Sequence, residues 1–156
     1  MASADENEHL AAMLEAAHRE TLNNLEGVDH NRVVYEDGGW TVQDVIGHLV
    51  AWEAQGLAAL QAHKLGVEYH ANYSFDSQLV YQETKDDEAQ RLYAEWEAVR
   101  ELLRATIIDM PTDRLLMTMH SPWGEYGHVH KLVGDMIAYQ REHIDAILRS
   151  SDKRAS

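Results

Sequence analysis

Histidine is the residue type whose number and placement point most directly to chemistry in this sequence. The chain has ten histidines, one phenylalanine and no cysteine. His48 lies inside the otherwise apolar stretch WTVQDVIGHLVAWE, and His143 lies inside AYQREHIDAI near the C-terminal end. A neutral imidazole binds borderline divalent metals and exchanges protons near neutral pH. The question that these two residues raise is whether the fold brings them together.

The elements that must position these histidines are helices. Apolar side chains recur at helical spacing in four long segments, which predict helices over about 4–25, 42–63, 84–110 and 128–149. Capping boxes are predicted at three of the starts: Ser3 with Glu6, Thr41 with Asp44, and Thr84 with Asp87. The stretch 64–76 is typical of a connection, 76–83 of a weak helical turn, and 120–127 of a loop. We therefore predict one domain, residues 1–156, folded as an all-α four-helix bundle with a long crossover between helices two and three.

Helix length predicts that His48 and His143 lie at the same level of this bundle. His48 is about seven residues into the second predicted helix, and His143 is about six residues from the end of the fourth. At 1.5 Å per residue, each lies roughly 10 Å from the corresponding helix end. If the two helices are antiparallel neighbours, the imidazoles meet, and Tyr139 lies one turn before His143. Such convergence can build a metal site, although a histidine at a core edge is more often an ordinary buried polar group.

Several other side chains are candidates for roles around this pair. Asp44, one turn before His48, either orients its ring or serves only in the capping box. Four aromatic residues are predicted to wall the pocket, namely Trp40, Trp52, Trp123 and Tyr126, and Trp52 also fits ordinary core packing. An alternative ligand set is His120, His128 and His130. The remaining histidines are predicted to lie on the surface or in loops: His9, His18, His30, His63 and His70.

Composition excludes several classes of protein. The formal net charge of −14 argues against binding a phosphate backbone, so we expect no nucleic-acid partner. No apolar run approaches the roughly 18 residues of a membrane span, and the acidic N-terminus lacks a signal-peptide pattern. The absence of cysteine excludes disulfides and a thiolate nucleophile, and it is compatible with the cytoplasm.

The two histidine-bearing segments resemble the signatures of the DinB-like superfamily of four-helix bundles. That superfamily includes thiol-dependent transferases and mycothiol-dependent maleylpyruvate isomerases. The resemblance implies a divalent metal held by one histidine from helix two and two from helix four. His48 matches the first ligand and His143 the third, whereas Tyr139 stands at the middle position. The implied metal site is therefore His48, Tyr139 and His143, with an ion of the Zn²⁺ or Ni²⁺ class and Tyr139 as third ligand or hydrogen-bonded to a metal water.

The function that this resemblance implies is that of a metal-dependent enzyme acting on a small molecule. Thiol-dependent transfer or isomerisation would need an external low-molecular-weight thiol, because the chain has no cysteine. One alternative is a non-catalytic bundle that has lost its metal and binds or sequesters a small ligand. Another is a structural dimer. We also expect a homodimer, because four helices of this length carry more apolar side chains than one core would hold. The side chains expected to be left over are Leu57, Leu60, Leu79 and Val80.

Overall fold

The computed structural model describes residues 2–67 and 89–155, with side chains from 6–67 and 89–150. The main helices are α1 (Ala2–Leu25), α2 (Val42–Leu65), α4 (Ala89–Ile108) and α6 (Val129–Ala155), and α5 (Thr112–Leu115) is one short turn. Two short antiparallel hairpins pair β1 (Val33–Tyr35) with β2 (Trp40–Thr41), and β3 (Met119–His120) with β4 (Tyr126–Gly127). The prediction of an all-α four-helix bundle is confirmed.

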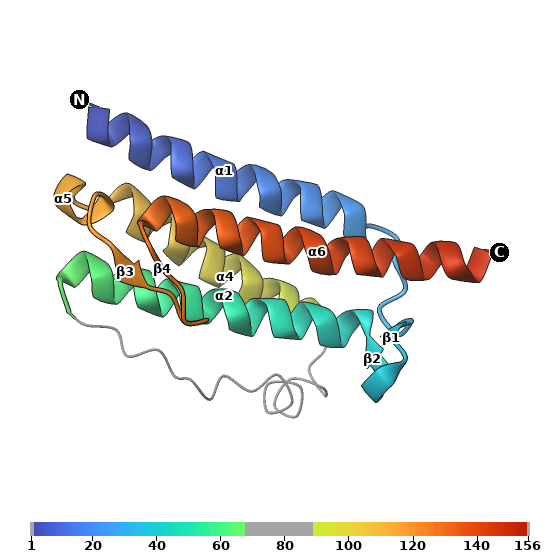
Figure 1. Cartoon of the computed structure of the whole chain (residues 1–156). Helices are drawn as coiled ribbons and strands as arrows, with labels where there is room; N and C mark the ends of the chain where they lie inside the picture. The colour runs from blue at the N-terminus through green and yellow to red at the C-terminus, as the bar shows by residue number, and fades with distance from the viewer. Residues whose placement is uncertain (1, 68–88, 156) are drawn as a thin grey trace.

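The directions of the helices explain why the two histidine segments can meet. Helices α1 and α6 run one way along the bundle, and α2 and α4 run the other way (Figure 1). Helix α2 is therefore antiparallel to its neighbour α6, as predicted. Helix α2 ends at the opposite end of the bundle from the start of α4, as a crossover connection requires.

Local sequence accounts for the ends of α2. Thr41 is the N-cap: its Oγ1 accepts from the Asp44 backbone N at 3.2 Å, and Asp44 Oδ2 accepts from the Thr41 N at 2.9 Å. Gly66 ends the helix in the left-handed region at φ 72°, which favours glycine. The predicted capping box at Thr41 is confirmed.

Other predicted boundaries were wrong or lie outside the described residues. Helix α1 begins at Ala2, so Ser3 lies within the helix and is not its N-cap. Helix α6 continues to Ala155, because no glycine or proline follows residue 149 to stop it. The expected 120–127 loop is largely a hairpin, and Gly124 at φ 85° permits its turn. The predicted Thr84–Asp87 box and the turn at 76–83 lie outside the described residues.

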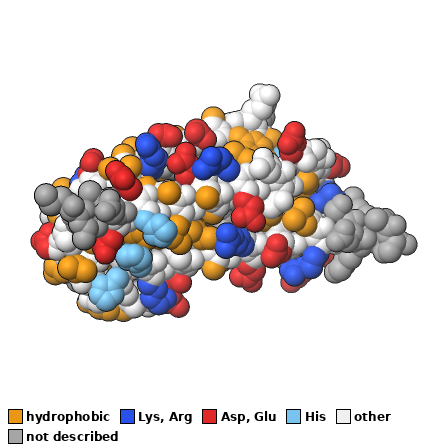
Figure 2. Space-filling view, turned by 90° about the horizontal axis from the view of Figure 1, so that it is seen from above, with side chains coloured by type: hydrophobic (Ala, Val, Ile, Leu, Met, Phe, Trp, Pro, Cys, Tyr) orange, Lys and Arg blue, Asp and Glu red, His pale blue; other side chains and the backbone are white. Residues whose placement is uncertain are grey.

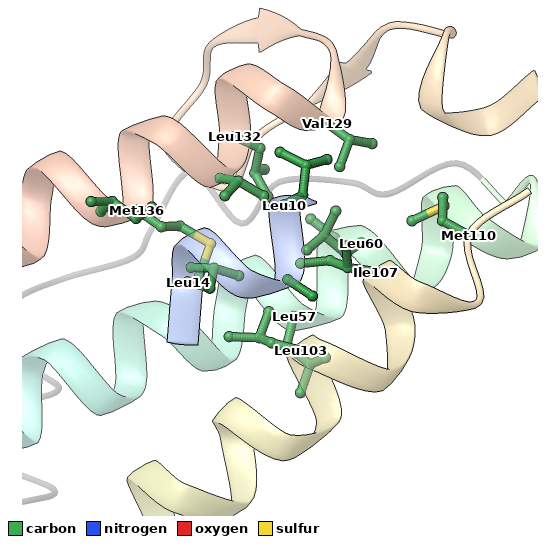
Figure 3. Close-up of a cluster of buried hydrophobic side chains, with 14 of the residues drawn as sticks. Leu10, Leu14, Leu57, Leu60, Leu103, Ile107, Met110, Val129, Leu132 and Met136 are labelled. Atoms are coloured by element: carbon green, nitrogen blue, oxygen red, sulfur yellow. The ribbon is translucent and has the colours of Figure 1, made fainter. Parts of the chain in front are cut away.

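The core fills the space between the four helices with aliphatic side chains. One cluster takes residues from every helix of the bundle (Figure 3): Leu10, Leu14, Leu57, Leu60, Leu103, Ile107, Val129, Leu132 and Met136. Burying each large aliphatic side chain contributes about 1.5–3 kcal/mol. Leu57 and Leu60 are 8% and 0% exposed, so the argument that they would be left for a dimer interface was wrong. Leu79 and Val80 lie outside the described residues.

Close approach of α2 and α6 depends on one glycine. A Cβ atom placed on Gly56 would come within 3.0 Å of the Met136 sulfur atom. Because glycine has no Cβ, Met136 packs against the backbone of α2 at this level. This contact helps bring the face of α6 that carries Tyr139 and His143 toward α2.

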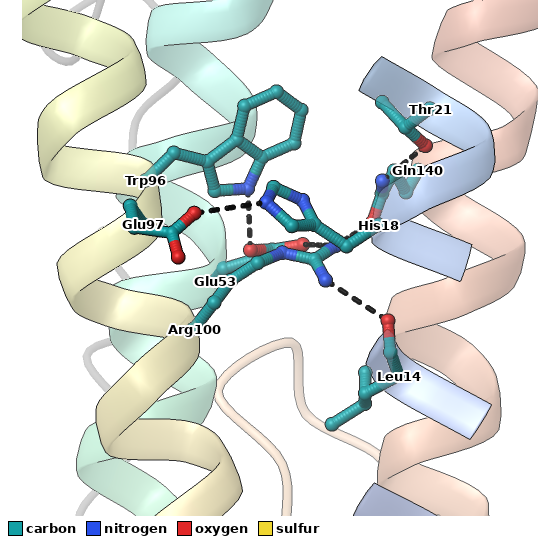
Figure 4. Close-up of polar contacts among 8 residues, drawn as sticks. All are labelled: Leu14, His18, Thr21, Glu53, Trp96, Glu97, Arg100 and Gln140. Carbon is teal, nitrogen blue, oxygen red and sulfur yellow. Dashed lines mark hydrogen bonds and ion pairs between the residues drawn. The ribbon is translucent and has the colours of Figure 1, made fainter. Parts of the chain in front are cut away.

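A buried acid and a buried base lie in the middle of the bundle. Glu53 of α2 is 1% exposed, and its Oε2 accepts a hydrogen bond from Trp96 Nε1 of α4 at 2.7 Å. Its Oε1 lies 3.4 Å from the guanidinium of Arg100 (Figure 4). Burial raises the pKa of Glu53, while the positive charge of Arg100 and both hydrogen bonds oppose that rise.

Arg100 extends this network to the other two helices. Its Nη1 donates to the Leu14 carbonyl of α1 at 2.9 Å, and its Nη2 donates to Gln140 Oε1 of α6 at 2.7 Å. The Gln140 amide in turn donates to Thr21 of α1 (Figure 4). The sequence pattern did not predict this network. Two of its features could have indicated it: Glu53 follows an apolar run, and Arg100 lies one helical turn from Trp96 on an apolar face.

Two histidines predicted for the surface are buried. His18 is 8% exposed, and its ring packs edge-on against Trp96 at 5.3 Å between ring centres. His63 is 7% exposed, and its Nε2 donates to the Arg114 carbonyl at 2.5 Å. His30 is half-buried and hydrogen bonds to the Tyr93 hydroxyl, His9 is exposed, and His70 lies outside the described residues. The prediction for His18 and His63 was wrong, because each lies on the helix face that packs inward.

Acid should destabilise the protein partly through His18. Burial, and to a smaller degree the charge of Arg100, lower the pKa of His18 to about 4. An unfolded histidine titrates near 6.5, so the unfolded chain binds more protons between these values, and stability falls as pH decreases. From pH 7 to pH 5, the free energy of unfolding should fall by about 2 kcal/mol more in the wild type than in His18→Leu. Urea unfolding at both pH values measures this difference, and equal falls would show that His18 is not held neutral.

On the face drawn in Figure 2, acidic and basic side chains are interspersed, and no basic stripe runs along it. Within residues 2–67 and 89–155, none of the helices is both long and apolar enough to cross a membrane.

Candidate functional site

The fold brings His48, Tyr139 and His143 together. His48 lies in the second turn of α2 and is 3% exposed, while Tyr139 and His143 are one turn apart on α6 and half-buried. The His48 and His143 ring centres are 5.7 Å apart, and the Tyr139 and His143 ring centres are 4.3 Å apart. The two imidazoles therefore meet as predicted, although the residue count behind the prediction was wrong at one end, because α6 extends to Ala155 and not to about residue 149.

Hydrogen bonds fix how the three side chains lie. The Tyr139 hydroxyl is 2.5 Å from His48 Nε2. His143 Nδ1 is 2.9 Å from the Tyr139 carbonyl oxygen, which can only accept, so this nitrogen carries the proton. Nε2 is then the nitrogen of His143 that could bind an ion or accept a proton. Engagement of Nδ1 by a carbonyl is a common way to orient a metal-binding imidazole.

Aromatic rings enclose the three residues on one side. Trp40, which immediately precedes the cap of α2, meets the His48 ring edge-on at 5.6 Å. Trp52 stacks on Tyr139 at 3.9 Å, and Trp123 stacks on Trp52 at 4.2 Å. Tyr126 packs edge-on against His120 instead, at 4.3 Å, and none of its described ring contacts is with these three residues.

The electrostatic environment keeps both His48 and Tyr139 uncharged. Burial, together with the neighbouring His143, lowers the pKa of His48 to about 4. Burial, together with the negative charge of Glu142 and the nearby Tyr35, raises the pKa of Tyr139 to about 12. His48 is therefore a neutral base near pH 7, and Tyr139 is a phenol that keeps its proton.

The other predicted participants are arranged differently. Asp44 Oδ2 accepts from the backbone N and the hydroxyl of Thr41, which supports the capping role. In the parts of the chain that the structure describes, no three His, Cys, Asp or Glu side chains gather closely enough to hold an ion. The alternative set of His120, His128 and His130 does not form such a group. Any ion at the His48–His143 pair would need Tyr139 or water to complete its coordination.

His48, Tyr139 and His143 are only partly suited to bind a divalent ion. Two imidazoles from antiparallel helices are suitable ligands. A phenol with a pKa of about 12 is a poor one, and its hydroxyl contacts Nε2 of His48, one of the two ring nitrogens that could bind an ion. In the arrangement as it stands, the Tyr139 hydroxyl is a hydrogen-bond donor beside a neutral imidazole.

Fold and site together define a DinB-like four-helix bundle. The family model described as the mycothiol maleylpyruvate isomerase N-terminal domain matches residues 11–130, and the chain belongs to this family. That range includes His48 and ends before Tyr139 and His143, so the match bears on only one of the three site residues.

Solved structures share the fold at low sequence identity. One is YfiT from Bacillus subtilis, described as a probable metal-dependent hydrolase with an unusual four-helix bundle topology. It is 17% identical with a TM-score of 0.78, over 97% of this chain and 89% of YfiT. A protein from Streptococcus pneumoniae is 16% identical with a TM-score of 0.69, over 94% of this chain and 90% of its own. No curated protein matches the sequence.

Proposed function

We propose that this protein is a metal-dependent enzyme that acts on a small molecule, with an ion of the Zn²⁺ or Ni²⁺ class. His48 and His143 are the proposed ligands, and Tyr139 is a third ligand or a hydrogen-bonding residue beside the ion. Imidazole suits these borderline ions, whereas Mg²⁺ and Ca²⁺ prefer oxygen ligands. One observation carries the proposal: the ring centres of His48 and His143, two residues far apart in the sequence, lie 5.7 Å from each other.

Each residue of the site has a defined part in this proposal. When bound, such an ion would act as a Lewis acid or would activate a thiol. His48 stays neutral near pH 7, and it would bind the ion together with His143. Tyr139 keeps its proton and can donate a hydrogen bond to a substrate oxygen, while Trp40 and Trp52 limit access of water.

The reaction that we propose is a thiol-dependent transfer or isomerisation. Membership of the mycothiol maleylpyruvate isomerase N-terminal family supports a low-molecular-weight thiol as co-substrate. The chain has no cysteine, so the thiol must come from solution. A homodimer and a cytoplasmic location stay predictions.

A second candidate function is supported by the hydrogen bond between Tyr139 and His48. At 2.5 Å, the hydroxyl engages His48 Nε2, one of the two nitrogens through which His48 could bind an ion. In this alternative the bundle has lost its metal, and the neutral Tyr139–His48 pair contributes to binding a small ligand without catalysis.

Metal content of protein purified without an affinity tag separates the two candidates. Elemental analysis of the wild type should find about one Zn²⁺ or Ni²⁺ per chain, because two imidazoles converge at one site. His143→Ala should lose this ion, and His9→Ala, an exposed histidine on α1, should keep it. Protein that carries no metal and takes up none on dialysis against Zn²⁺ would favour the non-catalytic candidate. Full occupancy in His143→Ala would show that the ion binds elsewhere.

A further inference from the structure

A cavity lies in the groove between α1 and α4, lined by residues other than the histidine pair. Its volume is about 190 Å³. The apolar part of its lining includes Leu14, Leu22 and Leu103, and its polar part includes His18 and Arg100. A pocket of this kind between two helices of a bundle is a common place for a small ligand.

Two buried polar groups that border this groove have no hydrogen bond. The His18 side chain is 10% exposed, and neither of its ring nitrogens makes a hydrogen bond within the described residues. Its Nε2 lies 3.5 Å from Glu97 Oε2 (Figure 4), a contact that is an ion pair only when the ring is protonated. The Nε of Arg100 is likewise buried without a hydrogen bond. Leaving such groups unsatisfied is costly because their desolvation is not compensated, so a partner for them would bind favourably.

The charge of the groove favours a neutral partner. Its lining contains three acidic and three basic side chains: Glu15, Glu97 and Glu101, with Arg19, Arg100 and Arg104. The two sets balance, so neither an anion nor a cation is attracted overall. A hydroxyl group suits His18 in either tautomer, because it can both donate and accept.

The size of the groove favours a single aromatic ring. An apolar cavity of about 150 Å³ in another protein accommodates benzene. We propose that the α1–α4 groove is a binding site for a small neutral aromatic alcohol of about the size of phenol. Its ring lies against Leu14, Leu22 and Leu103, and its hydroxyl hydrogen bonds to His18. Arg100 also hydrogen bonds to Gln140, the residue after Tyr139, so an occupant contacts the network that joins α1, α4 and α6.

Phenol and benzene form a matched pair of probes for this site. Both are titrated into the metal-free wild-type protein, and binding is followed by saturation-transfer NMR and by the ring protons of His18. Phenol should bind saturably and at least fivefold more tightly than benzene, because only phenol has the hydroxyl. The proposal is overturned if phenol does not saturate. Equal binding of the two compounds overturns it too, because water alone would then be satisfying His18.

Three variants test where the ring and the hydroxyl lie. Leu22→Trp fills the groove from a half-buried position and should weaken phenol binding at least tenfold. His18→Leu should remove the preference for phenol over benzene, and His9→Leu, an exposed change on the same helix, should leave it intact. Circular dichroism verifies that each variant is folded. Unchanged phenol binding in Leu22→Trp would show that the ring binds elsewhere and would overturn the assignment.

Discussion

Tyr139→His should tighten Zn²⁺ binding at least a hundredfold, about 2.7 kcal/mol. Two effects act in the same direction. The substitution supplies a third imidazole one turn from His143, and it removes the hydroxyl that lies 2.5 Å from His48 Nε2. The phenol it replaces has a pKa raised to about 12 and is a weak ligand near pH 7. Isothermal titration calorimetry of the metal-free proteins with Zn²⁺ measures the difference.

Two further variants make the zinc result interpretable. Tyr139→Phe removes the competing hydroxyl without adding a ligand, so it separates the two effects. His48→Ala in the Tyr139→His background should return affinity to the wild-type level or below. If Tyr139→His binds Zn²⁺ no better than the wild type, the pocket is not a metal site. The ligand-binding or structural interpretation should then replace the enzymatic one.

Arg100→Met should lower the free energy of unfolding by about 3–5 kcal/mol. The change leaves Glu53, 1% exposed, without its cationic partner, and it removes the donors to the Leu14 carbonyl and to Gln140. Breaking one side of a buried ion pair is costly because the remaining charge stays desolvated. Urea unfolding followed by tryptophan fluorescence measures the loss. The loss should shrink at low pH, where Glu53 takes up a proton.

A double substitution and a surface control test the cause of this loss. Adding Glu53→Gln to Arg100→Met removes the uncompensated charge while an amide oxygen still accepts from Trp96, so part of the stability should return. Arg91→Met breaks an exposed pair with Glu95 at 3.2 Å and should cost at most about 0.5 kcal/mol. A loss in Arg100→Met no larger than that of Arg91→Met would show that the buried network contributes little.

Much of the fold could be predicted because helix formation is largely a local property. The period of apolar residues identified the four long helices, and Thr41 with Asp44 identified the start of α2 to the residue. Helix ends that lack a capping residue or a stop signal were predicted less accurately. Helix α6 runs on to Ala155, since the sequence has no residue there that would stop it.

The candidate site was partly predictable for a geometric reason. In a bundle of helices with nearly equal length, depth along the axis follows from counting residues. Counting from the predicted helix ends placed His48 and His143 at one level, and their rings do meet, although α6 extends six residues beyond the end that the count assumed. The hydrogen bond from Tyr139 to His48 could not be predicted, because it joins residues 91 positions apart and depends on the rotation of two helices about their axes.

The sequence by itself determined the helices, the level of the histidine pair and the absence of an internal thiol. Only the tertiary structure decided which polar residues are buried. Arg100 and His18 lie in segments whose patterns also fit a solvent-exposed position, yet Arg100 bonds across 86 residues to Leu14 and across 40 to Gln140. Charged or polar residues beside an apolar stripe can face either solvent or a neighbouring helix. Which of these occurs depends on how the helices pack against one another, and that is a property of the whole bundle.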